Sequence, residues 1–239
     1  MINSLRVAAI IPARGGSKGL PRKNILPFAG KPLISWTIDQ ARASRLIDHV
    51  VVSTDDDEIA EVARKYGAMV PFRRPAALAS DTASSVDVVL HALDLMEQNG
   101  SGFSIVGLLE PTSPLREGAD IDGAIHKLVE TPQAESIVGV AVVECSHPAF
   151  LLREQGGFLV PYTGTPANNV RRQDVEPLLF LEGSIYVAYV DSLRRRRGFY
   201  HERTIGWQVA RYKSLEIDAM CDLIAGEALM TARLEGKLT

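Results

Sequence analysis

Residues 11–24 read IPARGGSKGLPRKN and directly follow an apolar run, Val7 to Ile11, that is typical of a buried strand. The stretch contains Gly15, Gly16 and Gly19, which let the backbone approach a ligand closely and adopt positive φ angles. Successive backbone N–H groups in such a loop form a nest for an anion. The stretch therefore predicts a strand followed by a cradle for phosphate groups.

Four cations share this loop, namely Arg14, Lys18, Arg22 and Lys23. Arginine offers a planar fork that fits phosphate, and lysine a mobile point charge. Neither G-x-x-x-x-G-K-[ST] nor G-x-G-x-x-G occurs here, so the loop is not one of the two common phosphate motifs. A basic surface loop is the alternative, but the position after the first strand favours a polyphosphate cradle. We expect Arg22 to face solvent, because neighbouring positions cannot all point inward.

The composition is that of a soluble globular protein, with 239 residues of which 46% are hydrophobic and 23% charged. A net charge of −3 argues against general nucleic-acid binding. Cys145 and Cys221 imply no disulfide framework, and the five histidines show no zinc spacing. No apolar stretch reaches the roughly 18 residues of a membrane span, and Arg6 and Arg14 interrupt any signal-peptide core. We expect a cytoplasmic enzyme with no nucleic-acid or membrane partner.

Strand-like apolar runs alternate with helix-like periodic segments along the chain. Strands are expected at residues 7–11, 50–53, 69–72, 105–109, 136–143, 184–189 and 205–209. Helices are expected at residues 32–45, after an N-cap at Thr54, from Ser80 or Asp81 to 98, at 118–130 and at 219–234. The alternation predicts an α/β fold, a Rossmann-like sandwich with a mostly parallel sheet and helices on both faces. The run Arg194–Arg197 is expected to be a solvated turn.

This pattern breaks between residues 144 and 177, where Gly156-Gly157 and a polar run interrupt it. The segment also carries apolar residues that need burial, which argues against a disordered linker: Phe150, Leu151, Leu152, Phe158, Leu159 and Tyr162. We assign residues 1–143 and 178–239 to one domain and residues 144–177 to an inserted arm.

The glycine-rich loop matches, from Pro12 to Asn24, the pattern P-A-R-x-G-S-K-x-x-x-x-K-N. This pattern resembles the opening of the CMP-sialic acid synthetases (N-acylneuraminate cytidylyltransferases) and the related nonulosonic acid cytidylyltransferases. Further matches follow in the family's order over nearly the full length: residues 52–55, 74–75, 78–85, 111–116, 172–173, 183–186 and 217–218.

The resemblance implies a nucleotidyltransferase that transfers CMP from CTP to the anomeric 2-hydroxyl of a nine-carbon 2-keto-3-deoxy sugar acid, with release of pyrophosphate. It implies nucleotide binding by Arg14, Gly15, Gly16, Ser17, Lys18, Lys23 and Asn24, with the cytosine against Arg74, Ala83 and Ser85. A guanidinium, a hydroxyl and backbone groups suit the edge of cytosine. Asn24 otherwise caps the turn before Ile25, and a helix start at residues 80–82 is compatible with the base-binding role.

A metal pair is expected at Glu216 and Asp218, because residues i and i+2 of an extended segment share a face. Carboxylates plus phosphate oxygens suit Mg²⁺. The resembling family commonly has two aspartates here, so Glu216 is a departure and binds directly or through water. The alternative role for either residue is an N-cap of the last helix. Lys23, Asn24 and Asp218 are the implied catalytic residues, and the general base is not identified.

Arg172 and Gln173 match the family's arginine–glutamine pair, and arginine binds a sugar carboxylate in bidentate fashion. Arg171 is the alternative register, and an exposed loop arginine the alternative role. The family usually has glutamine at Glu110 and asparagine at Glu182, both facing the sugar. Two carboxylates in place of two amides remove donors and add negative charge, so the substituents on the sugar are not determined. The candidates are a less common nonulosonic acid and a substrate with more hydroxyl donors.

The resemblance further implies a homodimer in which the arm packs on the other subunit and reaches its site. Folding of the arm back on its own sheet is the alternative. Two alternative functions are a nucleotidyltransferase for another sugar or nucleotide and a nucleotide-binding regulator without turnover. The presence of Lys23, Asn24 and Asp218 argues against the regulator.

Overall fold

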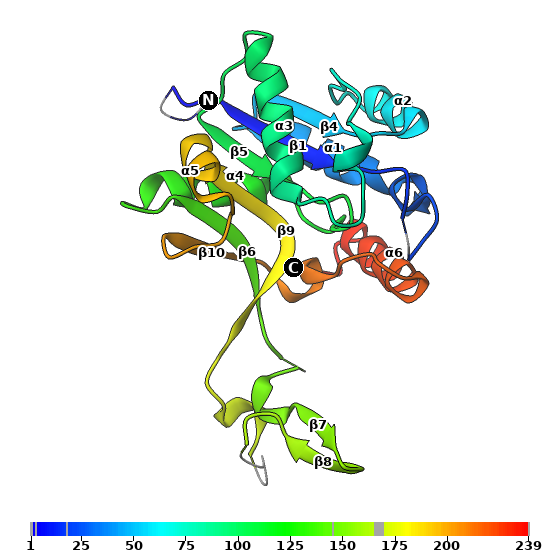
Figure 1. Ribbon diagram of the computed structural model, residues 1–239. Coiled ribbons are helices and arrows are strands. Elements are labelled where there is room, and N and C mark those ends of the chain that lie inside the picture. The colour runs from blue at the N-terminus through cyan, green and yellow to red at the C-terminus, as the bar shows by residue number, and fades with distance from the viewer. Residues whose placement is uncertain (1, 3, 18, 145, 165–169, 239) are drawn as a thin grey trace.

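A six-stranded sheet forms the centre of the protein (Figure 1), in a computed structural model that describes residues 2, 4–17, 19–144, 146–164 and 170–238. The strand order is β10-β6-β9-β5-β1-β4. The strands are β1 (Val7–Pro12), β4 (His49–Ser53), β5 (Ile105–Leu108), β6 (Ser136–Val142), β9 (Leu179–Tyr189) and β10 (Thr204–Gln208). Only β9 runs antiparallel to its neighbours in this sheet, so the predicted mostly parallel α/β architecture is confirmed.

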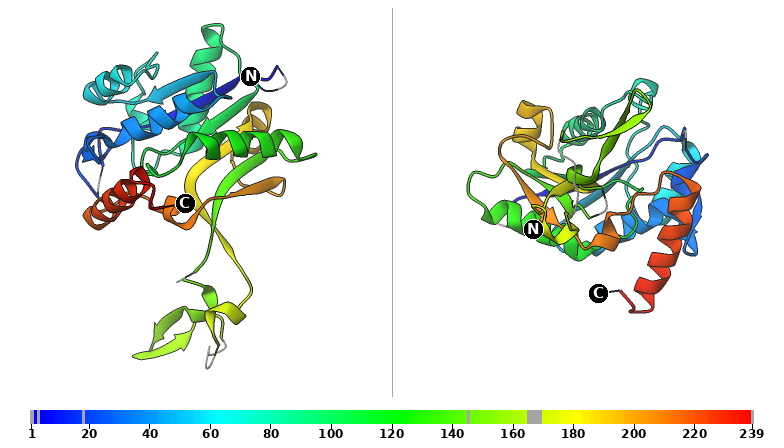
Figure 2. Two further views of the ribbon diagram at one scale, coloured as in Figure 1. Left: turned by 180° about the vertical axis from the view of Figure 1, so that it is seen from behind. Right: turned by 90° about the horizontal axis from the view of Figure 1, so that it is seen from below.

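Helices cover both faces of the sheet (Figures 1 and 2). One face packs against α1 (Leu33–Ala43), α2 (Asp57–Lys65) and α4 (Gly118–Glu130), and the other against α3 (Ser85–Gln98) and α5 (Val190–Arg196). Along β1, Ala9 and Ile11 belong to the first core and Ala8 and Ile10 to the second. This two-sided burial explains why the strand is a continuous apolar run rather than an alternating one.

The last helix, α6 (Met220–Leu234), packs on a third, smaller core that includes Phe28, Leu33 and Ile217. Phe28 comes from the short ribbon of β2 (Pro27–Phe28) and β3 (Lys31–Pro32). Single 3-10 turns complete the body: η1 (Lys23–Ile25), η2 (Ala76–Leu78) and η5 (Arg211–Ser214). This core holds the segment after Leu215 against the sheet edge where β1 ends.

The strand predicted at residues 69–72 is wrong. Met69 forms only an isolated bridge with Val51, and Pro71 has no N–H to continue a ladder. The predicted N-cap at Thr54 is also wrong, because the Asp56 carboxylate accepts from the N–H of Ile59 at 3.0 Å and caps α2.

Two further predictions, one of a helix start and one of a turn, need correction. The helix expected from Ser80 or Asp81 begins only at Ser85, where the Ser84 hydroxyl accepts from the Val86 N–H at 3.2 Å. The run Arg194–Arg197 is not a simple turn, since its first three residues end α5. Its side chains pair with acids on neighbouring elements: Asp87, Asp94, Glu97, Glu135 and Glu202.

The arm leaves the sheet after β6 and returns in β9, and Figures 1 and 2 show it projecting away from the body. It contains η3 (Pro148–Phe150), a hairpin of β7 (Leu152–Gln155) and β8 (Phe158–Pro161), and η4 (Arg172–Asp174). Leu152, Phe158 and Leu159 are 56%, 76% and 69% exposed. The arm therefore does not fold back on its own sheet, and its apolar side chains lack cover within one chain.

Candidate functional site

The loop after β1 is fixed at the carboxyl edge of the sheet by three hydrogen bonds. Ala13 N donates to Ser53 O at 2.9 Å, and Gly15 N donates to Asp55 Oδ1 at 3.0 Å. The Asn24 amide donates to Arg14 O at 3.0 Å. Because Asn24 spans the loop in this way, it does more than cap the local turn, and its contact with a nucleotide stays a prediction.

Lys23 and Arg22, two of the cations in this loop, lie in different environments. Lys23 Nζ donates to Asp218 Oδ1 at 2.7 Å. Arg22 pairs instead with Asp56 and Glu58 near the start of α2, so its side chain serves an ion pair away from Lys23. Lys18, predicted to bind phosphate, lies outside the described residues.

A cavity of about 200 Å³ lies between the loop and the start of α3. Arg14 and all three predicted base-binding residues line it, and the remaining lining residues are Pro12, Leu78, Ser80, Asp81, Val88 and Glu110. Arg74 is 5% exposed, and its Nε and one Nη have no hydrogen-bond partner among the described residues. Its Nη2 forms a long ion pair with Asp55 Oδ1 at 3.7 Å. The cavity thus presents a buried guanidinium fork with unsatisfied donors.

Ser80, Asp81 and Ala83 line this cavity because α3 starts after them. Arg14 Nη1 pairs with Asp81 Oδ1 at 2.5 Å and links this segment to the glycine-rich loop. The late start of the helix, which the sequence pattern did not reveal, therefore shapes one wall of the cavity.

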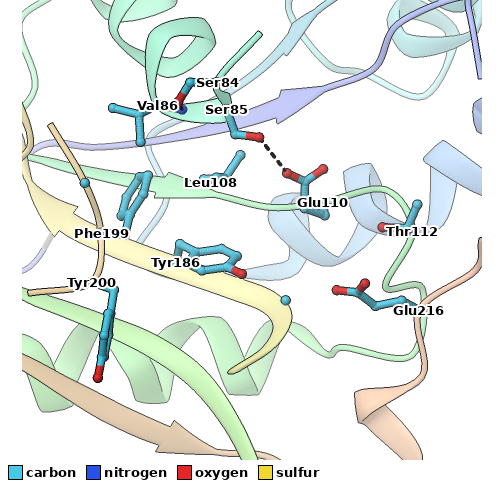
Figure 3. A pocket seen from close by; sticks show the side chains of 12 residues that line it. Ser84, Ser85, Val86, Leu108, Glu110, Thr112, Tyr186, Phe199, Tyr200 and Glu216 are labelled. Carbon is cyan, nitrogen blue, oxygen red and sulfur yellow. Dashed lines mark hydrogen bonds between the residues drawn. The ribbon is translucent and has the colours of Figure 1, made fainter. Parts of the chain in front are cut away.

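A larger cavity of about 520 Å³ adjoins the first (Figure 3). Two carboxylates, Glu110 and Glu216, and three aromatic rings, Tyr186, Phe199 and Tyr200, line it, and none of its lining residues that the structure describes is a cation. The other lining residues are Ser84, Ser85, Val86, Leu108, Thr112, Gly183 and Gly198. Ser85 and Glu110 belong to both cavities, so two ligands could meet across this pair.

The two carboxylates of the larger cavity are only partly compensated by nearby cations, Arg116 and Lys23 for Glu110 and Lys23 for Glu216. Burial, and then the Glu216 carboxylate, raise the pKa of Glu110 to about 7. Burial and Asp218 likewise raise the pKa of Glu216. Burial and the surrounding carboxylates raise the pKa of Tyr186 to about 12. Such shifts indicate a site that gains from a bound cation or from hydrogen-bond donors.

The predicted metal pair does not cap α6. The Asp222 carboxylate accepts from the N–H groups of Asp218 at 3.1 Å and Ala219 at 2.7 Å, which excludes the capping role for Glu216 and Asp218. Two carboxylates near one another are a donor set that suits Mg²⁺ completed by phosphate oxygens and water. Within the described parts of the chain, no group of three or more His, Cys, Asp or Glu side chains forms a closed metal cage.

Gly183 leaves the space that the Glu216 side chain occupies. Its φ is +84°, and a Cβ at this position would overlap Glu216 Oε1. The β6–β9 register shifts between Val138 and Val140, close to where Gly183 lies on β9. A glycine at this bend is what allows a carboxylate from residues 215–218 to reach the cavity.

Two buried charges lie beside the site. Arg116 is fully buried and donates to Ser184 O at 2.5 Å and to Thr37 Oγ1 at 2.9 Å. Burial lowers its pKa to about 10. Arg116 lies in one of the matching motifs, although no role was predicted for it, and its buried contacts identify it as a brace between α1 and β9.

Glu182 is 2% exposed, accepts from the Ser184 hydroxyl and packs against Gly139 of β6. It does not line either cavity. Direct contact between Glu182 and a sugar therefore stays a prediction that this geometry does not support. Glu110, in contrast, lies on the cavity surface as expected.

Of the predicted sugar-carboxylate pair, the side chain of Gln173 is described, and it does not line either of these cavities within one chain. Arg172 and Gln173 lie in η4 of the arm, and Gln173 lines a separate cavity of about 380 Å³ at the base of the arm. No described residue of that cavity is shared with the larger one.

A glycine-rich cation loop, a base-sized cavity and a carboxylate pair at the carboxyl edge of an α/β sheet define a nucleotidyltransferase. The chain belongs to the cytidylyltransferase family, whose model matches residues 8–229. Among its relatives is the CMP-N,N'-diacetyllegionaminic acid synthase of Legionella pneumophila, which is 36% identical over 97% of this chain and 99% of the relative.

Other relatives carry different sugars in their names. The N-acylneuraminate cytidylyltransferase of Streptococcus agalactiae is 35% identical over 92% of this chain, which spans 52% of that protein's length. The pseudaminic acid cytidylyltransferase of Campylobacter jejuni is 45% identical over 61% of this chain and 62% of the relative's length.

The fold has relatives among solved structures. A CMP:2-keto-3-deoxy-manno-octonic acid synthetase complexed with CTP aligns with a TM-score of 0.69 and 19% identity, over 95% of this chain and 99% of the other. This likeness concerns the fold alone. Over the described residues, none of the helices has the length and apolar character needed to cross a membrane.

Proposed function

We propose that this cytidylyltransferase transfers CMP from CTP to the anomeric 2-hydroxyl of a nine-carbon 2-keto-3-deoxy sugar acid, a sialic acid or a related nonulosonic acid, and releases pyrophosphate. The observation that carries the proposal is the pair of adjoining cavities that share Ser85 and Glu110. The smaller cavity accommodates the base and the larger one the sugar, with Lys23 and Asp218 beside them. The names of the full-length relatives support a sugar acid as acceptor. We place the reaction in the cytoplasm.

The smaller cavity suits cytosine because Arg74 presents unsatisfied donors in a desolvated setting. Cytosine offers acceptors at O2 and N3, which a guanidinium fork matches. Arg74→Ala removes these donors and leaves the cytosine acceptors unpaired in the cavity, so it should raise the KM for CTP by about tenfold or more. Steady-state kinetics at saturating sugar measure this effect, and an unchanged KM would contradict the assignment.

In the reaction, the sugar 2-hydroxyl oxygen forms a bond with the α-phosphorus while the bond to the β-phosphate oxygen breaks and pyrophosphate leaves. The hydroxyl proton passes to a base that we do not assign. Positioning and charge neutralisation supply most of such catalysis. Arg14 and Lys23 would hold the triphosphate, and a Mg²⁺ ion held by Glu216 and Asp218 would neutralise phosphate charge. Lys23 and Asp218 neutralise one another in the structure, so each is ready to accept a ligand of opposite charge.

We also propose a homodimer in which the arm of one subunit completes the site of the other. A sugar acid is an anion, yet within the described part of the chain no cation lines the larger cavity. Arg172 and Gln173 lie on an arm whose apolar side chains are exposed in one chain. A second copy of the chain would cover these residues and bring the missing cation.

The test is a pyrophosphate-release assay with CTP, Mg²⁺ and a panel of nonulosonic acids. We expect turnover that requires both CTP and a sugar acid, with UTP, ATP and GTP much poorer. Comparable turnover with a purine nucleotide would contradict the base assignment. CTP binding without pyrophosphate release for any sugar acid would favour the non-catalytic regulator.

A further inference from the structure

The larger cavity has the chemical composition of a cation-binding site. Among its described lining residues, the two charged ones are acidic and the largest side chains are aromatic. Of the two acids, Glu216 already belongs to the proposed metal pair. Glu110 has no such role, although it lies on the surface of the cavity that would receive the sugar.

The carboxylate of Glu110 is poorly satisfied by the protein. Its one described hydrogen bond is a long one, 3.5 Å from Ser85 Oγ (Figure 3). The nearby guanidinium of Arg116 contacts the backbone carbonyl of Glu110 at 3.5 Å and is otherwise engaged with Thr37 and Ser184. A glutamine here would both donate and accept, whereas a carboxylate only accepts.

Three aromatic residues line the same cavity, and Figure 3 shows Tyr186 on the side of Glu110, with Phe199 and Tyr200 farther from the carboxylate. The rings of Tyr186 and Phe199 have centroids 5.7 Å apart and are tilted by 53°, and Tyr200 is 72% exposed at the cavity mouth. Aromatic faces attract cationic nitrogen groups, most strongly where water is partly excluded. A carboxylate beside aromatic faces is therefore better suited to a positively charged group than to a neutral amide or hydroxyl.

We propose that Glu110 and the wall of Tyr186, Phe199 and Tyr200 select a sugar acid that carries a cationic nitrogen substituent, an amine or an amidine. The inference rests on the proposed function and narrows its substrate class. An amidinium is planar and offers parallel N–H donors to a carboxylate, while an ammonium offers a point charge. The sugar's own carboxylate then faces away from Glu110, toward the side that the arm of a second copy would reach.

The experiment compares pairs of nonulosonic acids that differ at one nitrogen only, amine or amidine against acetamido, in the pyrophosphate-release assay with CTP and Mg²⁺. For the unmodified protein, we expect kcat/KM for the cationic member to exceed that for the neutral member by about tenfold or more. In Glu110→Gln this ratio should fall close to one. Because the ratio compares two sugars on one variant, general damage to the variant cancels.

A second variant tests the aromatic wall without altering buried structure. Tyr200→Leu should lower the same ratio and Tyr200→Phe should preserve it, since the phenyl ring keeps its face toward the cation. Glu130→Gln, an exposed carboxylate on α4, is the matched control and should keep the full ratio. A ratio of one or less in the unmodified protein, or an undiminished ratio in Glu110→Gln, would overturn the inference. Absence of turnover with both members of every pair would overturn the proposed function itself.

Discussion

At the scale of single residues, Asp218 is where the proposed metal and the phosphate-binding loop meet. Its carboxylate is 69% exposed and pairs with Lys23, so it contributes to charge balance more than to packing. Asp218→Asn removes a charge that the metal needs, and we expect kcat to fall by about a hundredfold or more with little change in melting temperature. Glu216→Gln should cost less, because Asp218 is the ligand that matches the pattern of the resembling family, whereas glutamate at 216 departs from it.

Pyrophosphate release during a Mg²⁺ titration measures the effect on Asp218→Asn. Asp94→Asn, which removes an exposed carboxylate paired with Arg194, is the control and should retain activity. Full activity of Asp218→Asn, or undiminished activity of the unmodified protein in EDTA, would refute the metal pair.

Gly183 is a second residue with a sharp expectation. Its positive φ disfavours any side chain, and a Cβ would collide with Glu216 Oε1. Gly183→Ala should therefore displace Glu216, destabilise the protein by about 1–2 kcal/mol and abolish most activity. Gly102→Ala is the matched control, because a Cβ at Gly102 meets nothing within 4 Å. Equal activity of the two variants would show that the position of Glu216 is not critical.

At the scale of elements, sequence patterns correctly predicted the features that depend on interactions between neighbouring residues, such as the start of a helix. Helix α4 has the expected bounds of Gly118–Glu130, because Glu117 and Asp120 form a capping box that marks its start. Residues 69–72 have the composition of a strand, but Pro71 and a missing neighbour limit them to one bridge. Long-range pairing decides that outcome, and no local pattern reports it.

The same distinction holds for the site. Arg74, Ala83 and Ser85 were expected around one base, and all three line one cavity. The carboxylate at Glu182 was expected on the cavity surface, yet its position beside Gly183 turns it toward β6. Its direction follows from the register shift between β6 and β9, which a sequence motif does not encode.

The link between η5 and α4 makes an element-scale prediction. Lys213 donates to Glu117 at 2.6 Å and to Asp120 at 2.8 Å, just before the segment that carries Glu216. Lys213→Met leaves two carboxylates without their cation, and we expect a loss of about 2 kcal/mol, below the value for a fully buried pair because Glu117 is partly exposed. Chemical denaturation measures it, and unchanged stability would contradict the linkage.

The same contact has a pH signature. Burial lowers the pKa of Lys213, but the hydrogen bonds to Asp120 and Glu117 outweigh it and leave the pKa above its usual value. A pKa raised by folding means that the contribution is complete below the unfolded value of about 10.4 and is lost as the pH rises through the folded value. Melting temperature should therefore fall more steeply above about pH 10 in the unmodified protein than in Lys213→Met. Equal slopes would exclude this contribution.

At the scale of the whole molecule, the arm is the feature that one chain leaves incomplete. Phe158, Leu159 and Tyr162 at its tip are 76%, 69% and 63% exposed, and such contiguous apolar surface marks an interface. We expect a dimer by light scattering at micromolar concentration. Replacing Leu152 and Phe158 together by Asp should give monomers with little change in the folding of the body, and a monomeric unmodified protein would refute the dimer.

Subunit mixing distinguishes a dimer that only associates from one whose sites are shared. Lys23→Ala is expected to remove a residue that the body of a subunit contributes to the site. Arg172→Ala is expected to remove one that the arm contributes to the site of the other subunit. In a mixed dimer, the body of the Arg172→Ala chain meets the intact arm of the Lys23→Ala chain. Random mixing of equal amounts then restores about a quarter of the sites. A mixture of Lys23→Ala with Asp218→Asn, two lesions of the body, should show no such recovery. If the first mixture also stays inactive while mixed dimers form, each site is built from one chain, and the cation that the sugar carboxylate needs must come from within it.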